Sequence, residues 1–330
     1  MSGSPREGDA RVKQTTLRLG LLRLGSRRSP MATAQSRQVA DMITERTGRG
    51  VEIVGITTLG DVSRAQLTQI GGTGVFVSAL REALLAGEVD LAVHSLKDLP
   101  TGPAAGIVLA AVPPRDDPRD ALIARDGAKL ADLRPGATIG TGSPRRAAQL
   151  LALRADLRCV PIRGNANTRL EQVSKGELDA VVLALAGLAR IGAVSAVTQV
   201  FEPEEMLPAP GQGALAIECR SGEPELAAAL ETVTDYASLA AVTAERSLLE
   251  ALEAGCSAPV GAYAVGFEQL RLQAAVMSTD GSRVLRAHGV APGADASQLG
   301  RDLAAELLAS GAGDLISVPQ ARTSVGNDVQ

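Results

Sequence analysis

The chain has 330 residues, of which 45% are hydrophobic and 2% aromatic, and its formal net charge is −4 at pH 7. This length and composition are typical of a globular protein with two or three domains, and they exclude an intrinsically disordered chain. The acidic balance and the scarcity of aromatic side chains argue against nucleic-acid binding, which depends on basic surfaces and on stacking platforms.

The N-terminal stretch, residues 1–16, is polar and lacks the apolar core of a secretory signal, so we expect a disordered tail. The sequence has no apolar run long enough to span a bilayer, and no membrane partner is expected. The three cysteines include no CxxC pair, which is typical of a reducing compartment, and we predict a cytoplasmic protein. Because the chain has only two histidines, no metal site is predicted.

Short apolar runs alternate with helical patterns along the first two thirds of the chain. Strands are predicted at 17–25, 51–56, 90–94, 106–112, 137–140, 158–162 and 179–185, and helices near 31–47, 75–87, 144–154 and 167–175. In the helix over 75–87, Phe76, Leu80 and Leu84 recur at helical spacing, and Gly87 ends it. Such alternation predicts mostly parallel sheets with crossover helices.

Two segments dense in proline and glycine, 113–118 and 207–213, interrupt this alternation. They bracket one complete α/β unit, and a buried-type strand at 214–218 follows the second. We predict that the chain leaves a first lobe, builds a second and returns, with a cleft between the lobes at the strand ends. The alternative is that both segments are ordinary surface loops. In the bilobed interpretation the first lobe comprises 17–113 and 214–233, and the second comprises 114–213.

The pattern changes near residue 234. A long helix at 238–255 precedes three strand-like runs, at 258–266, 270–278 and 283–290, and a last helix near 296–310. An Asp-Gly pair between the second and third runs is typical of a hairpin. We therefore predict a small α+β domain over 234–330.

Arginines gather at three turns that each follow a predicted strand and precede a predicted helix. These turns are SRRSP (26–30), GSPRR (142–146) and RGNANTR (163–169). Backbone N–H groups at a helix start attract anions, and guanidinium groups add bidentate donors for carboxylate or phosphate. Solvated surface arginine is the alternative, and it explains Arg154 and Arg158 well. It explains Arg145, Arg146, Arg163 and Arg169 poorly, because they lie at strand-to-helix turns beside Gly, Ser and Asn.

Two further stretches contain side chains that could take part in catalysis or in covalent attachment. In HSLKDLP (94–100), Lys97 and Asp98 follow a strand; they form either a weak surface ion pair or a site in which Asp98 faces the cleft and stabilises a developing cation. His94 is expected in the core. Cys256, in GCSAP just after the long helix, is either a buried cysteine or a covalent anchor.

Several stretches, in this order, resemble the porphobilinogen deaminase (hydroxymethylbilane synthase) family. They are RRSP, GGTGVFVSALREALL, DLAVHSLKDLP, DDPRDALI, GTGSPRR, PIRGNANTRL, DAVVLALAGLARIG, LPAPGQGALAIECR and TAERSLLEALEAGCSAPVGAYA. The resemblance covers nearly the whole chain from residue 17, and the combination of HSLKD, RGNANTRL, GQGA and the cysteine in GCSAP is highly specific.

This resemblance implies a transferase of tetrapyrrole (haem) biosynthesis. Such an enzyme joins four porphobilinogen molecules head to tail, releases ammonia at each step and frees hydroxymethylbilane by hydrolysis. It uses a dipyrromethane cofactor held by a thioether to one cysteine, which matches Cys256. Because every pyrrole carries an acetate and a propionate, the arginine-rich turns would neutralise a growing polyanion.

The resemblance also implies roles for individual residues. Asp98 matches the catalytic carboxylate and would stabilise the cationic azafulvene left when ammonia departs. The cofactor carboxylates would be held by Lys97, Ser143, Arg145 and Arg146. The incoming substrate and the growing chain would be held by Arg27, Ser29, Gln35, Arg163, Arg169 and Arg190. The implied fold is α/β, with two type II periplasmic-binding-protein-like lobes joined by a two-strand hinge, and a small α+β domain that carries the cysteine.

The glycine-rich loop GGTG (71–74) departs from the family pattern. Thr73 and Gln69 stand where lysines are frequent, so shielding of the chain by loop cations is not implied. The alternative function is a bilobed protein that binds or senses a small anion without catalysis, which would use the same sheets and turns but gives no role to Cys256. The family further implies a monomer.

Overall fold

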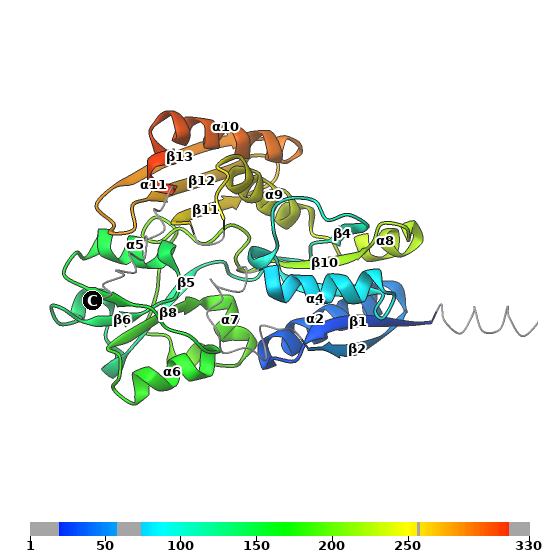
Figure 1. Ribbon diagram of the computed structural model, residues 1–330, viewed down its shortest axis with the longest axis horizontal. Coiled ribbons are helices and arrows are strands. Elements are labelled where there is room, and N and C mark those ends of the chain that lie inside the picture. The colour runs from blue at the N-terminus through cyan, green and yellow to red at the C-terminus, as the bar shows by residue number, and fades with distance from the viewer. Residues whose placement is uncertain (1–19, 58–73, 256–257, 317–330) are drawn as a thin grey trace, which may run out of the picture.

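The computed structural model describes residues 20–57, 74–255 and 258–316 (Figure 1). Two sheets with flanking helices lie side by side, and a third unit, built from a smaller sheet and its helices, lies above both of them in this view.

The first lobe is a five-stranded sheet in the order β2-β1-β3-β10-β4. β1 pairs in parallel with β2 and β3, whereas β10 is antiparallel to both of its neighbours. Side chains alternate between the faces of a strand, so Leu91 and Val93 pack with α2 and α8, while Ala92 packs with α4. The elements are β1 (Leu21–Arg27), α2 (Pro30–Thr47), β2 (Gly50–Ile56), α4 (Gly74–Leu85), β3 (Leu91–Ser95), β4 (Ile107–Ala111), β10 (Leu215–Arg220) and α8 (Pro224–Glu231).

The second lobe repeats this arrangement in the order β7-β6-β8-β5-β9. Again one strand, β5, is antiparallel to its neighbours, and helices cover both faces: α5 packs on one, and α6 and α7 on the other. The elements are β5 (Asp120–Ala124), β6 (Thr138–Gly140), α5 (Pro144–Leu153), β7 (Arg158–Val160), α6 (Ala166–Ser174), β8 (Ala180–Ala184), α7 (Leu185–Arg190) and β9 (Gln199–Val200).

The two sheets have the same strand order. In each sheet the strand contributed by a crossover, β10 in the first lobe and β5 in the second, lies between the third and the last of the lobe's other four strands. The chain passes from β4 to β5 and later from β9 to β10, so it leaves the first sheet and returns to it. This is the topology of type II periplasmic-binding-protein-like lobes. The prediction of two lobes is therefore confirmed, and the alternative of two ordinary surface loops is wrong.

The C-terminal unit packs helices on one face of an antiparallel sheet, β11-β12-β13. Helices α9 and α10 approach closely at Gly300, where an added Cβ would lie 2.3 Å from the carbonyl oxygen of Ala244. The predicted helix over 238–255 ends earlier, at Ala251, because Glu253 adopts a left-handed backbone conformation (φ 50°). The elements are α9 (Tyr236–Ala251), β11 (Val260–Val265), β12 (Leu270–Met277), β13 (Val284–Ala291), α10 (Ala296–Ala309) and α11 (Ala312–Ile316).

One fully buried carboxylate joins this unit to both crossovers. Glu245 of α9 forms an ion pair with Arg115 of the first crossover, at 2.6 Å between Oε1 and Nη1. It also accepts hydrogen bonds from the backbone N–H of Gly211 in the second crossover (2.6 Å) and of Ala264 in β11 (2.8 Å). Glu245 thus ties both crossovers to the third unit.

Candidate functional site

The first part of the site follows β3. The chain enters a single 3-10 turn, Leu96–Asp98, which carries Lys97 and Asp98. Leu96 is fully buried and its N–H donates to the carbonyl oxygen of Ala214, so the turn is held against the second crossover. Gly211 permits this approach, because it has a φ of 75° and an added Cβ would lie 2.5 Å from Leu96 Cδ2.

The second part lies at the start of α5. Ser143 caps the helix by accepting the N–H of Arg146, and Pro144 occupies its first turn. Arg145 and Arg146 point inward and are only 3% and 7% exposed. Both form ion pairs with Asp120, the fully buried first residue of β5, at 2.8 Å and 2.7 Å between the guanidinium nitrogens and carboxylate oxygens.

Backbone carbonyls complete the hydrogen bonding of the two arginines. Arg145 donates to the carbonyl oxygen of Leu207, and Arg146 donates to that of Val182 at 3.1 Å. Burial alone would raise the pKa of Asp120, but the two guanidinium groups and the hydrogen bonds from Arg146 and Gln212 hold it well below its usual range.

Lys97 joins these residues from the other lobe. Its Nζ donates to Oε1 of Gln212 at 3.3 Å, and the same oxygen lies 3.5 Å from Nη2 of Arg146. Burial, followed by the charge of Arg146, lowers the pKa of Lys97 to about 8. The charge of Asp98 acts on Lys97 and opposes the effect of burial on its pKa. Asp98 itself is half-buried.

The cluster fits a group that carries carboxylates. Lys97, Arg145 and Arg146 supply three positive charges against the two negative charges of Asp98 and Asp120. The Nε atom of Arg145 is buried and has no hydrogen-bond acceptor within residues 20–57, 74–255 and 258–316, and the same is true of Arg190 Nε. Buried donors without an acceptor are costly, and carboxylate oxygens of a ligand would satisfy them.

The structure places three of the predicted residues at the carboxyl end of the first sheet. Arg27 ends β1, and Ser29 caps α2 by accepting the N–H of Ala32. Gln35 of the same helix is 5% exposed and donates to Ser95 Oγ at 2.9 Å. These residues therefore lie near the end of β3, next to the turn that carries Lys97 and Asp98.

The remaining predicted arginines differ in their surroundings. Arg163 is exposed in the loop before α6. Arg169 is partly buried and donates to the carbonyl oxygen of Gly164; burial and the charge of Arg146 lower its pKa, so it lies within electrostatic reach of the cluster. Arg190 already has partners within the protein: it forms an ion pair with Asp116 (2.6 Å) and donates a hydrogen bond to the carbonyl oxygen of Gly213.

Sequence reasoning missed Asp120 and Gln212. Both stand in stretches that carried the family resemblance, DDPRDALI and GQGA, but neither was assigned a role. The signal for Asp120 is an acid within a short apolar run, at the first position of a fully buried strand, where a charge needs a partner. Cys256, Thr73 and Gln69 lie outside the described residues. His94 lies in the core as expected, 3.2 Å from Glu218.

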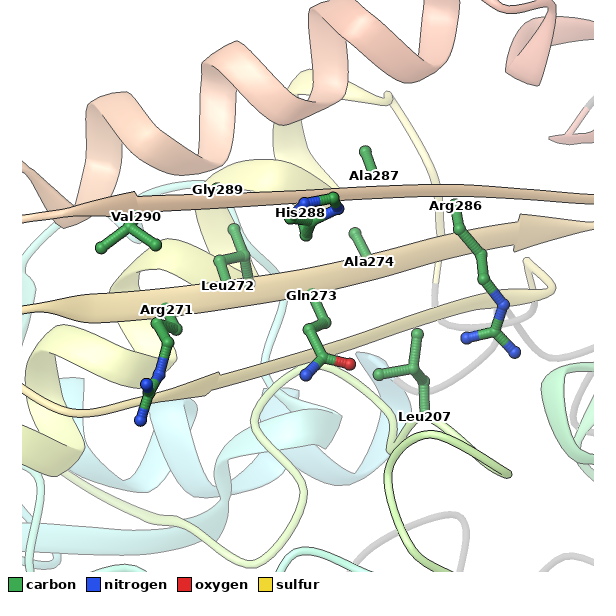
Figure 2. Close-up of a pocket in the computed structure, with 10 residues that line it drawn as sticks. All are labelled: Leu207, Arg271, Leu272, Gln273, Ala274, Arg286, Ala287, His288, Gly289 and Val290. Atoms are coloured by element: carbon green, nitrogen blue, oxygen red, sulfur yellow. The ribbon is translucent and has the colours of Figure 1, made fainter.

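A groove of about 300 Å³ lies on the face of the C-terminal sheet that is turned toward Leu207 of the second crossover (Figure 2). Arg271 and Gln273 of β12 and Arg286 of β13 point from the sheet toward Leu207. None of the site residues predicted from the sequence lines it. In the part of the chain that the structure describes, no group of three or more His, Cys, Asp and Glu residues is placed to hold a metal ion, and no helix is long and apolar enough to cross a membrane.

Known proteins match this chain along most of its length. The family model described as "Porphobilinogen deaminase, dipyromethane cofactor binding domain" matches residues 22–228, and "Porphobilinogen deaminase, C-terminal domain" matches residues 239–309. The porphobilinogen deaminase of Thermobifida fusca is 61% identical, covering 89% of this chain and 95% of its own, and porphobilinogen deaminase 1 of Streptomyces coelicolor is 55% identical, covering 89% and 97%. Among solved structures, a periplasmic substrate-binding protein of an ABC transporter from Coxiella burnetii is 16% identical, covers 68% of this chain and 96% of its own, and has a TM-score of 0.42.

The fold and the site define a bilobed α/β protein with a third domain and a buried cluster of cations at the strand ends. With the matches above, the chain belongs to the porphobilinogen deaminase family. It is a transferase of tetrapyrrole biosynthesis with a domain for the dipyrromethane cofactor, and the alternative of an anion-binding protein without catalysis is not favoured.

Proposed function

We propose that Lys97, Ser143, Arg145 and Arg146 hold the carboxylates of the dipyrromethane cofactor in the condensation of porphobilinogen to hydroxymethylbilane. The observation that carries this assignment is the burial of two adjacent arginines against a single carboxylate, Asp120, beside Lys97 of the other lobe. Lys97, Arg145 and Arg146 outnumber the carboxylates of Asp98 and Asp120, and this positive balance within the described residues suits an anionic ligand.

Asp98 is the catalytic carboxylate in this proposal. It is half-buried, its charge acts on Lys97, and in this proposal it faces the cationic reactant. A fixed charge opposite a developing charge stabilises the transition state when ammonia leaves the substrate. When bound, the cofactor supplies the pyrrole α-carbon onto which the substrate units are added.

The outer cations serve the substrate and the growing chain. Arg27, Ser29 and Gln35 lie at the carboxyl end of the first sheet. Arg163 and Arg169 flank the start of α6, and Arg190 ends α7. These three arginines belong to the second lobe, so the carboxylates of each new pyrrole would be bound by residues of both lobes.

The cofactor is attached through a thioether to Cys256 in this proposal. The other two thiols support the choice by exclusion: burial raises the pKa of Cys159, and it raises the pKa of Cys219 to about 11. A thiol with a raised pKa holds little of the nucleophilic thiolate at neutral pH. We further infer a cytoplasmic monomer that acts without nucleic acid or membrane; light scattering coupled to gel filtration tests the oligomeric state.

Intact-mass measurement tests the attachment. The purified protein is expected to be heavier than its sequence by one dipyrromethane, with the added mass on the peptide that contains Cys256, and to react with Ehrlich's reagent. Cys256→Ser should abolish both signals, because a hydroxyl without an activating base is a poor nucleophile. Cys159→Ser and Cys219→Ser are the matched controls and should keep both. An unmodified but active wild-type protein would refute the attachment.

A further inference from the structure

A single buried amide lies where the two lobes and the second crossover meet. Gln212 is 1% exposed. Its Nε2 donates to Oδ1 of Asp120 at 2.8 Å and to the carbonyl oxygen of Pro118 at 2.7 Å. Its Oε1 accepts from Nζ of Lys97 and from Nη2 of Arg146. Both amide hydrogens and both lone pairs of the oxygen therefore have partners.

The chemistry of these partners fixes the orientation of the amide. The nitrogen faces a carboxylate and a carbonyl, which only accept hydrogen bonds. The oxygen faces an ammonium and a guanidinium, which only donate them. Turning the amide over would place like groups together in all four contacts, so one orientation is far more stable.

We propose that Gln212 is a positioning residue that fixes Lys97, carried by the first lobe, against the Asp120–Arg146 pair of the second lobe. This inference rests on the proposed function, because that function assigns Lys97 and Arg146 to the same cofactor. The two cations then have their spacing set by the protein before an anion binds, and preorganised donors bind more tightly than mobile ones.

The pKa of Lys97 depends on its hydrogen bond to Gln212, so a measurement of that pKa tests the contact. Within the described part of the chain, the charges of Asp98, Asp120, Arg145 and Arg146 act on this lysine, and burial together with the arginines lowers its pKa to about 8. A hydrogen bond from the ammonium to the Gln212 oxygen favours the charged form. Loss of that oxygen should lower the pKa of Lys97 further, whereas a negative charge in its place should raise it.

The experiment measures the acidity of Lys97 in the purified holoenzyme by competitive acetylation over a range of pH. The chain has only four lysines, Lys13, Lys97, Lys129 and Lys175, so peptide mass spectrometry separates them. Gln212→Met keeps the side-chain length without the hydrogen bonds, and Gln212→Glu adds a charge. Gln149→Met is the matched control. Gln149 is 3% exposed, and its hydrogen bonds go to backbone atoms of Leu207 and Arg145 rather than to Lys97 or Asp120.

We expect the midpoint of Lys97 reactivity to fall by about half a pH unit or more in Gln212→Met and to rise in Gln212→Glu, with no shift in Gln149→Met. Midpoints equal to wild type in both Gln212 variants, or shifts in the same direction in both, would overturn the proposal. If only one Gln212 variant folds, the direction of its own shift decides. The expected shifts combined with full cofactor occupancy by intact mass would uphold the positioning role and count against Lys97 as a cofactor ligand, so the two proposals fail separately.

Discussion

Asp120 holds two arginines although its charge can neutralise only one. Its carboxylate is fully buried, both guanidinium groups are nearly so, and Gln212 supplies a further hydrogen bond. Buried charges are tolerated only when paired and hydrogen-bonded, so the carboxylate is what permits two cations to stand side by side at the start of α5. The second arginine is left with charge for a ligand.

We predict that Asp120→Asn destabilises the protein strongly, because it leaves two buried guanidinium groups without a counter-charge. Breaking a buried pair in this way costs about 3–5 kcal/mol in free energy of unfolding, which urea denaturation can measure. Asp156→Asn removes an exposed carboxylate that pairs with Arg154 at the surface and should have no measurable effect. Equal stability of Asp120→Asn and wild type would show that the arginines are solvated.

A second prediction at this scale concerns Asp98. Asp98→Asn keeps the size and hydrogen-bonding capacity of the side chain but removes its negative charge. We expect the cofactor to remain attached, as judged by intact mass, while kcat falls by a factor on the order of 10²–10³. Turnover close to that of wild type would remove Asp98 from the catalytic role.

At the scale of elements, a buried charge network joins α4 to the centre of the first sheet. Arg81 of α4 forms two hydrogen bonds with Glu218 of β10, at 2.6 Å and 3.0 Å, and His94 of β3 lies 3.2 Å from the same carboxylate. Burial would raise the pKa of Glu218, but His94 and Arg81 outweigh it and lower the pKa to about 2. The strand that ends in the site is thereby tied to the helix beside it.

This network predicts an acid-dependent stability. Because the pKa of Glu218 is depressed in the folded state, its stabilisation is present above the ordinary value near 4.5 and is lost as the pH falls toward 2. We expect Glu218→Gln to lower the free energy of unfolding at pH 7 by roughly 2–3 kcal/mol and to make the decline between pH 5 and pH 3 shallower. The free energy of unfolding is measured by urea denaturation at each pH. An equally steep decline in variant and wild type between pH 5 and pH 3 would contradict the assignment.

Elements with a strong local signal could be predicted from the sequence, and those defined by distant partners could not. Helix α2 begins at Pro30 after a serine cap and ends before Gly48, and these capping residues can be read directly. β5 was missed because its five residues are buried on both faces and show no alternation. α7 was missed because it continues without a break from an apolar strand.

The same distinction applies to the site. The arginine turns stand out because cations, glycine and helix starts coincide within a few residues. The carboxylate that balances Arg145 and Arg146 lies 26 residues from Arg146, and the amide that links them to Lys97 lies 115 residues from that lysine. Such pairings are set by the folded topology, and no local pattern encodes them.

At the scale of the molecule, Glu245 holds the third domain and both crossovers together. We predict that Glu245→Gln leaves Arg115 as an uncompensated buried charge and lowers the free energy of unfolding by about 3 kcal/mol or more. Hydrogen exchange should accelerate together in peptides that contain Gly211 and Ala264, since both N–H groups donate to this carboxylate.

The matched control for this prediction is Glu250→Gln, because Glu250 is an exposed residue of the same helix. Faster exchange at only one of the two N–H groups, or an equal effect in the control, would show that the three segments are not coupled.

The return of the chain to the first sheet has a consequence for synthesis on the ribosome. Among the described strands, β4 pairs only with β10. One edge of β3 also remains unpaired until β10 is in place. The second lobe, from β5 to β9, emerges complete before β10 has been translated. The lobe that starts first is thus finished last, and its exposed strand edges must be protected from aggregation while roughly a hundred further residues are added.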